Sequence, residues 1–344
     1  MIIKKGTKNF IFLTVKCAVI ALLIVIIPFI YINYFYLVEG QPTYGEDAIY
    51  NPASGDMNNI ELPGDAKQMG VTPDQKYYLY MMDGEMHVNK TDDNEPIKII
   101  SEKNPIIYSV PMDDRNIILY FTYDSGAGVI GMHSYNIDQD IIMQQASMNT
   151  KNFSGIKQVE YSSLTNLIYV NVKVMKNNTE QNLIYKINIM KRVSQYSSGK
   201  IVKSMALLNG AETIYFQDKD NNILRNNVKL NLIKDEKEGF NLLGVDADDN
   251  VYIQSIQELH TIYKIKDNAI INKISLKNPD FIGVYPDKDG VYLLYKDHII
   301  NIANRDEPAA VIHEGNDFIG VFGGFMYLKT PENKIEAINL KLGH

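Results

Sequence analysis

Hydrophobic and polar residues alternate with a period of two along most of the chain after residue 57, which is typical of half-buried β-strands. The clearest example is "GVYLLYKDHIINI", in which two alternating runs are joined by the polar pair Lys296–Asp297. A helical repeat would instead place apolar residues at i, i+3 and i+4, and this stretch does not. The pattern therefore predicts a succession of short antiparallel hairpins.

A strand of this kind with an aromatic residue at or next to its centre recurs seven times. The copies lie at residues 76–80, 117–121, 167–171, 213–217, 250–254, 290–294 and 325–329. Successive copies are 35 to 50 residues apart, and a period of about 40 residues with four short strands per unit is the signature of propeller blades. We therefore predict an all-β fold, a seven-bladed β-propeller with four antiparallel strands, a to d, in each blade.

The sixth unit shows how one blade is written. Its four strands are expected at residues 280–285, 290–295, 298–303 and 308–312, with the first turn at 286–289. The inner strand "DFIGVY" is echoed by "DFIGVF" at the start of the seventh unit, which leaves no room for a fourth strand of its own. We expect Asn58–Leu62 to supply that strand by pairing with Lys334–Asn339, since closure of the ring removes open sheet edges.

This topology assigns every loop to a face of the ring. The a–b and c–d turns lie on one face, which is also where the chain enters from its N-terminus, and the b–c and d–a loops lie on the other. Longer loops are expected on the second face. They are residues 123–131, 146–155, 175–182 and 233–240.

The N-terminal segment predicts a membrane anchor. Residues 17–38 contain no charged residue, and about 20 apolar residues suffice to span a bilayer. Lysines precede this segment, whereas residues 39–66 carry acids and no base, so the positive-inside rule leaves the N-terminus in the cytoplasm. Cleavage by signal peptidase is disfavoured because the apolar run is long and ends without an A-x-A-like site.

The expected organisation therefore has four parts. They are a cytoplasmic tail (1–16), a transmembrane helix (17–38), an acidic stalk (39–56) and an extracytoplasmic propeller (57–344).

Several motifs resemble binding sites but fit turns better. "GAGVIG" at 126–131 matches G-x-G-x-x-G but is followed by an alternating strand, so we expect a hairpin and no nucleotide site. Acidic turns such as "DADDN" lack the spacing of a calcium loop, although calcium at one of them stays open. The six histidines are scattered and Cys17 is the single cysteine, so no metal site and no cofactor are predicted. A net charge of about −11 outside the N-terminal lysines argues against a nucleic-acid partner.

With its D-x-D-G turns and strand period, the repeat resembles the NHL, PQQ-like and TolB-like propeller repeats over residues 57–342. The tryptophan typical of PQQ-like blades is replaced by tyrosine, since the chain contains no tryptophan. The resemblance implies a propeller and leaves the function open, because propellers host both binding scaffolds and hydrolases.

Our first functional hypothesis is a binding or assembly module for an envelope protein, a peptide or a glycan, acting through loops on a rigid scaffold. Candidate binding residues are the aromatic and basic residues that we expect to be exposed in those loops. They are Tyr123, Lys151, Phe153, Lys176, Lys234 and Phe240.

Two other functions remain compatible with the sequence. A propeller hydrolase or lyase could use carboxylates at the central funnel as acid and base, with Asp124, Glu160 and Asp246 as candidates. An extracellular sensor subunit would need a partner protein for output, because the predicted cytoplasmic tail is short.

Overall fold

The computed structural model describes residues 16, 22, 60–232, 239–287, 290–304, 307–322 and 324–340. Contacts divide the chain into two compact units, Met1–Asn51 and Pro52–His344, and the strands described below belong to the second. Within the described part of the chain, no helix has the length and apolar character needed to cross a membrane. The transmembrane helix predicted at 17–38 falls outside the described residues except for Leu22.

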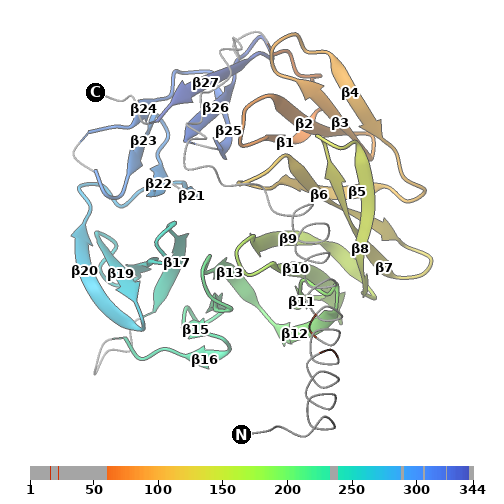
Figure 1. Cartoon of the computed structure of the whole chain (residues 1–344). Helices are drawn as coiled ribbons and strands as arrows, with labels where there is room; N and C mark the ends of the chain where they lie inside the picture. The colour runs from red at the N-terminus through yellow and green to blue at the C-terminus, as the bar shows by residue number, and fades with distance from the viewer. Residues whose placement is uncertain are drawn as a thin grey trace, which may run out of the picture. The chain divides into compact units, whose positions relative to one another are not determined.

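The second unit is a ring of seven antiparallel sheets, which confirms the predicted propeller (Figure 1). In every sheet the strands neighbour one another in chain order. The first strand of each sheet contacts the first strand of the next sheet, and the first strand of the seventh sheet contacts that of the first. These seven strands are therefore the inner strands of the ring.

The blades follow one another around the ring. Blade 1 consists of β1 (Lys67–Val71), β2 (Tyr77–Met82), β3 (Glu85–Lys90) and β4 (Pro96–Ile100). Blade 2 consists of β5 (Ile106–Pro111), β6 (Ile117–Asp124), β7 (Val129–Asn136) and β8 (Ile141–Asn149). Blade 3 consists of β9 (Phe153–Ser162), β10 (Leu167–Lys176), β11 (Thr179–Ile187) and β12 (Val193–Lys200). Blade 4 consists of β13 (Val202–Leu207), β14 (Ile214–Asp218), β15 (Ile223–Arg225) and β16 (Val228–Lys229).

The remaining three blades complete the ring. Blade 5 consists of β17 (Phe240–Val245), β18 (Val251–Ser255), β19 (Thr261–Lys266) and β20 (Ala269–Ser275). Blade 6 consists of β21 (Gly283–Asp287), β22 (Gly290–Leu294), β23 (His298–Asn301) and β24 (Ala310–Val311). Blade 7 consists of β25 (Asp317–Phe322), β26 (Phe325–Lys329) and β27 (Ile335–Asn339).

A buried tyrosine on the second strand of every blade is the main structural feature of the repeat. These residues are Tyr78, Tyr120, Tyr169, Tyr215, Tyr252, Tyr292 and Tyr327, each at most 5% exposed. The rings pack between neighbouring blades, as Tyr120 of blade 2 does against Leu79 and Met86 of blade 1. A buried aromatic ring removes about 150–250 Å² of surface from water, so these tyrosines contribute strongly to the cohesion of the ring.

The seam of the ring is closed by the segment that precedes blade 1. Glu61 forms an antiparallel bridge with Lys334, and the amide of Leu62 donates to the carbonyl of Asn333 at 2.9 Å. Ile60 is fully buried against the cores of blades 1 and 7. The predicted pairing of Asn58–Leu62 with Lys334–Asn339 is confirmed at Glu61, whereas Asn58 and Asn59 lie outside the described residues.

The loops of blades 2 and 3 are much shorter than the sequence predicted. The strands on either side extend into the residues that were expected in loops. The remaining connections, at 125–128, 150–152 and 177–178, therefore contain only two to four residues. At the tightest of them, Asn177 and Asn178 adopt φ angles of 50° and 58°, as a type I′ hairpin turn requires. The expected long loops at 123–131, 146–155 and 175–182 are therefore wrong.

The inner strand of blade 6 begins and ends later than predicted. Its inner strand begins at Gly283, and Pro286 and Asp287, which were expected in a turn, pair with Val291 and Gly290. Proline is tolerated there because the inner strand is the edge of its sheet and needs no donor on that side.

Candidate functional site

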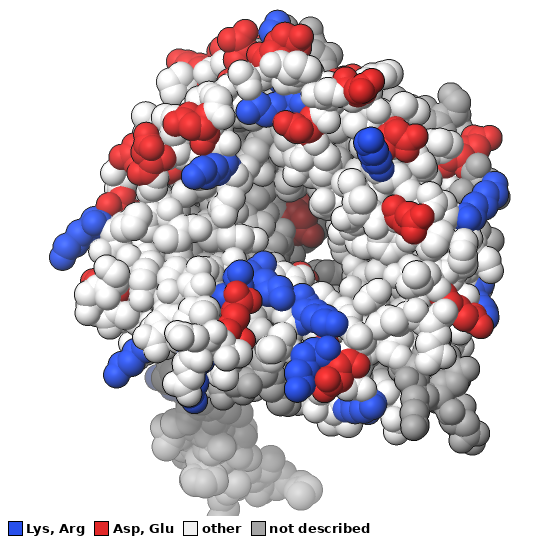
Figure 2. Space-filling model, turned by 180° about the vertical axis from the view of Figure 1, so that it is seen from behind, with Lys and Arg blue, Asp and Glu red and all other residues white. Residues whose placement is uncertain are grey.

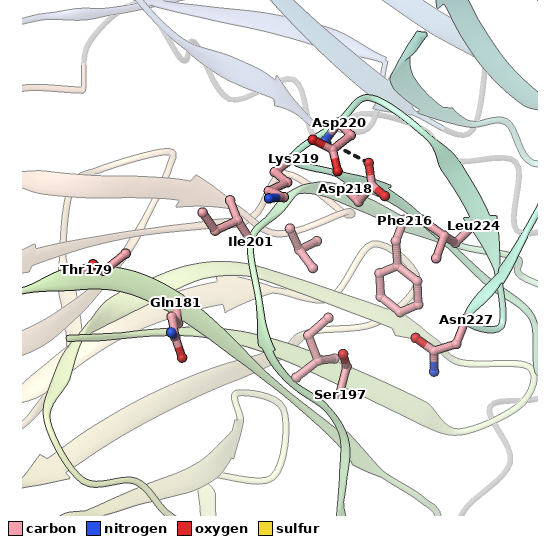
Figure 3. Close-up of a pocket in the computed structure, with 12 residues that line it drawn as sticks. Thr179, Gln181, Ser197, Ile201, Phe216, Asp218, Lys219, Asp220, Leu224 and Asn227 are labelled. Atoms are coloured by element: carbon pink, nitrogen blue, oxygen red, sulfur yellow. Dashed lines mark hydrogen bonds between the residues drawn. The ribbon is translucent and has the colours of Figure 1, made fainter. Parts of the chain in front are cut away.

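A groove between blades 3 and 4 forms a concave site in the described part of the ring. Its volume is about 280 Å³. Figure 3 shows it between β11 and β12 on one side and β14 and β15 on the other. Thr179 follows the b–c turn of blade 3, and Asp218–Asp220 begin the b–c turn of blade 4. Most of the rim therefore lies on the face that carries the b–c and d–a connections.

The floor of the groove is apolar and its rim is polar. Ile184, Val202 and Phe216 are each at most 4% exposed and form the floor. Ile201, which joins blade 3 to blade 4, is 40% exposed at the opening. Hydrogen-bonding groups surround the opening. They belong to Thr179, Gln181, Ser197 and Asn227. An apolar floor with a few convergent polar groups is the usual composition of a binding site.

A short outer strand and one buried asparagine shape the groove. The outer strand β16 has only two residues, Val228 and Lys229, so blade 4 presents a much shorter outer edge than blade 3. Asn182 is buried and its side-chain oxygen accepts a hydrogen bond from the amide of Val202 at 2.9 Å. This contact fixes the start of β13 against β11 at one side of the groove.

Asp218 shapes the rim as a turn residue. One carboxylate oxygen accepts hydrogen bonds from the amides of Asp220 (2.9 Å) and Asn222 (2.8 Å), and the other accepts from the side chain of Asn222. Aspartate stabilises turns in this way. Lys219 and Asp220 at the tip of the turn are exposed and available to a ligand.

Lysines gather beside the groove. The ammonium of Lys157 donates to the carbonyl of Val202 at 2.9 Å, and that of Lys203 donates to the side chain of Asn221. The pKa of Lys157 is below its ordinary value because of partial burial and because Lys173 and Lys203 lie near it, with Glu180 acting in the opposite direction. Figure 2 shows basic side chains along the lower edge of the central hollow, on a domain that is acidic overall. We call Lys157, Lys173 and Lys203 the lysine cluster.

Four of the six predicted binding residues come together at the junction of blades 2 and 3. The rings of Tyr123 and Phe153 are half-buried, with centroids 4.4 Å apart. Lys151 is exposed on the connection between the two blades, and Lys176 is exposed at the end of β10. The amide of Met175 donates to the carbonyl of Asn152 at 2.9 Å, which holds these turns side by side. Their part in binding stays a prediction.

The other two predicted residues do not join this group. Phe240 is 7% exposed and packs edge-to-face on Tyr263 in the core of blades 4 and 5. The expectation that Phe240 is exposed is therefore wrong, because it is the first residue of an inner strand and not part of a loop. Lys234 lies outside the described residues.

The three carboxylates considered for catalysis lie apart and have different surroundings. Asp124 accepts a hydrogen bond from the amide of Ala127 at 2.9 Å in the b–c turn of blade 2. Asp246 is in the a–b turn of blade 5, on the opposite face, and is 8% exposed. Burial alone would raise its pKa, but hydrogen bonds from Asn250 and Tyr252 and the charge of Lys264 lower the pKa below its ordinary value.

Glu160 is the carboxylate with the most unusual environment. It lies on the inner strand β9, where burial raises its pKa to about 7 despite hydrogen bonds from Gln158 and from the amide of Leu207. Neither Asp124 nor Asp246 shares this position, so the structure does not assemble the proposed acid–base pair from these three residues.

The motifs expected to be turns are turns. The glycine-rich motif supplies the hairpin at 125–128, in which Gly128 has a φ of 67° and donates its amide to the carbonyl of Asp124 at 2.8 Å, and β7 follows it. Among the described residues, no group of three His, Cys, Asp or Glu side chains could hold a metal ion.

The groove and the lysine cluster were missed by sequence reasoning, although one signal was present. Lys157 and Lys203 hold equivalent positions in their blades. Each lies three residues before the inner-strand residue that pairs with the buried tyrosine, which is Glu160 opposite Tyr169 in blade 3 and Ala206 opposite Tyr215 in blade 4. Basic residues at one repeat position of consecutive blades could have indicated a cationic site at their junction. The groove itself depends on the shortness of β16, which the sequence does not reveal.

Comparison with known proteins supports the fold alone. No protein-family model and no curated protein matches the sequence. Among solved structures, the chain resembles Sqt1 of Saccharomyces cerevisiae, at 11% identity and a TM-score of 0.52 over 83% of this chain and 85% of that one. It also matches Hsv2 of Kluyveromyces marxianus, at 10% identity and a TM-score of 0.47 over 79% of this chain and 91% of that one. These neighbours are β-propeller proteins.

Proposed function

We propose that this chain is a membrane-anchored propeller that acts outside the cytoplasm and binds an envelope protein at the groove between blades 3 and 4. The observation that carries the proposal is the groove itself, a cavity of about 280 Å³ with an apolar floor beside the lysine cluster. This combination suits a peptide segment that carries apolar and acidic side chains. The anchor and its orientation are supported by the uncharged segment 17–38 and the charges that flank it. Descent from NHL, PQQ-like or TolB-like repeats is part of the same proposal and is supported by the strand period and turn chemistry.

Site-specific photo-crosslinking in intact cells tests the binding site. A photoreactive amino acid replaces Ile201 at the mouth of the groove, and the same amino acid replaces the exposed Val311 on the outer strand of blade 6 as the control. We expect a discrete cross-linked protein with the first variant and not with the second. Ser197→Trp, which fills the groove, should abolish the product, whereas Ser194→Trp on the same strand should not. Equal products at both positions, or a product insensitive to Ser197→Trp, would contradict the proposal.

Localisation is tested separately. In a chain with Cys17→Ser, the exposed Lys296 is replaced by cysteine and treated with a thiol reagent that cannot cross membranes. Labelling in intact cells is expected, and labelling only after lysis would place the propeller inside the cell.

A further inference from the structure

The c–d turn of blade 3 presents two adjacent apolar side chains to solvent, which is unusual for a hairpin tip. Ile189 and Met190 are each 68% exposed. Scattered single apolar residues are normal on protein surfaces, but turns ordinarily select Gly, Asn, Asp, Pro and Ser. Two large apolar residues at this position therefore need an explanation that the fold alone does not supply.

The turn is built so that these side chains point outward. The side chain of Asn188 accepts hydrogen bonds from the amides of Met190 (3.1 Å) and Arg192 (3.0 Å), and its carbonyl accepts from the amide of Lys191 at 2.8 Å. Lys191 has a φ of 58°, which closes the loop. With the backbone satisfied internally, Ile189 and Met190 form an ordered apolar tip.

Basic side chains flank the tip, and other apolar residues lie at the same end of the ring. Lys191 and Arg192 are exposed, and neither forms an ion pair with another described residue. Leu164, in the a–b turn of the same blade, is 70% exposed. The neighbouring outer strand β8, which contacts β12, begins at this side with three exposed apolar residues. They are Ile141, Ile142 and Met143.

The entry point of the chain indicates what this surface meets. At its bridge with Lys334, Glu61 runs antiparallel to β27, so the chain there points from the side of the a–b and c–d turns toward the side of the b–c and d–a connections. The chain between the expected anchor and Ile60, residues 39–59, can extend by at most about 70 Å. The hairpin tip lies on the side from which the chain points as it enters the described ring at Ile60 and Glu61.

We propose that the tip of the blade 3 hairpin inserts into the interfacial region of an anionic bilayer. Ile189 and Met190 enter among the lipid chains near the headgroups, while Lys191 and Arg192 contact lipid phosphates. Apolar groups flanked by basic ones have this affinity for anionic membrane surfaces. The inference rests on the membrane anchoring in the proposed function, and it fixes one face of the propeller against the membrane.

Fluorescence in reconstituted vesicles tests it with the full chain. In a Cys17→Ser background, Met190→Cys carries a polarity-sensitive fluorophore, and Leu259→Cys, 45% exposed in a b–c turn on the opposite face, is the matched control. In vesicles of phosphatidylglycerol and phosphatidylcholine, we expect a blue shift and strong quenching by lipid-borne nitroxide for the label at 190, and neither at 259. Lys191→Gln with Arg192→Gln should lower the equilibrium constant for insertion of the tip, derived from the quenching, about five-fold per charge removed, and should do so in anionic and not in neutral vesicles.

The outcomes separate the two levels of the proposal. A chain that floats with the vesicles while the label at 190 behaves like the label at 259 overturns the hairpin contact and leaves the anchor intact. A chain that does not float with the vesicles overturns both the anchor and the contact.

Discussion

Gln158 of blade 3 holds the backbone of Met205 in blade 4 from both sides. Its side-chain amide donates to the carbonyl of Met205 at 2.7 Å, and its side-chain oxygen accepts from the amide of Met205 at 3.0 Å. The inner strands β9 and β13 form no backbone hydrogen-bond ladder with each other. The side chain of Gln158 supplies the hydrogen bonds that a neighbouring strand would give to Met205. This clasp lies next to Glu160 and on the same inner strand as Lys157, so it positions both blades that form the groove.

Replacement of Gln158 by leucine should destabilise the propeller by about 2–4 kcal/mol, because two backbone groups of Met205 lose their partners in a partly buried site. Gln144→Leu, at an exposed position of β8, is the control and should change stability by less than about 0.5 kcal/mol. Urea unfolding of the detergent-solubilised chain, followed by far-UV circular dichroism, measures both. Equal effects would show that the clasp adds nothing.

Glu160 should make the stability of the propeller depend on pH. Its pKa in the folded chain is raised from an ordinary value of 4.5 to about 7. Below about 4.5 the group is protonated in both states, and as pH rises toward 7 the unfolded chain ionises first, so stability falls. The loss is at most about 3 kcal/mol and is complete above pH 7.

Glu160→Gln removes the titrating group and keeps its shape. The difference in unfolding free energy between this variant and the wild-type chain should therefore increase in favour of the variant between pH 5 and pH 8. A difference that does not change with pH would mean that Glu160 titrates normally.

The ring could be predicted from the sequence because its cause is local and repeated. Alternation with a period of two, a tyrosine on every second strand and turn residues between strands all recur, and Tyr78 and Tyr292 occupy the same buried position in different blades. Even the seam followed from the pattern, since the last unit lacked a strand that Glu61 could supply.

The features that could not be predicted from the sequence depend on packing between blades and on where each strand begins and ends. Phe240 is buried because it packs on Tyr263 and against the core that blade 5 shares with blade 4, and nothing in its neighbouring residues indicates where β17 begins. Tyr123 and Phe153 were expected in long loops, but the strands of blades 2 and 3 extend through these positions and leave turns of a few residues. The groove arises from the two-residue strand β16, which a repeat pattern alone does not specify.

Charge reversal in the lysine cluster should weaken partner binding without unfolding the ring. Lys157→Glu combined with Lys203→Glu is expected to lower the yield of the cross-link formed at Ile201 about ten-fold or more, because it replaces attraction by repulsion beside the groove. The control is Lys277→Glu combined with Lys296→Glu, in the d–a connection before blade 6 and the b–c turn of blade 6, on the same face and with the same total charge change. An equal loss for both would point to net charge and not to a site.

The assignment of every loop to a face, and with it both proposals, depends on a ring that is closed by the segment before blade 1. Glu61 and Lys334 face each other at a bridge that lies between the flanking hydrogen bonds, where Cα atoms are about 4.5 Å apart, within the range of a disulfide. In a Cys17→Ser chain, Glu61→Cys with Lys334→Cys should oxidise to an intramolecular disulfide and raise the Tm. Glu61→Cys with Glu336→Cys, two residues further along β27, is the control and should remain reduced. A disulfide between 61 and 334 is the predicted result, and no cross-link there, or equal cross-linking to 336, would contradict the closed seven-bladed ring.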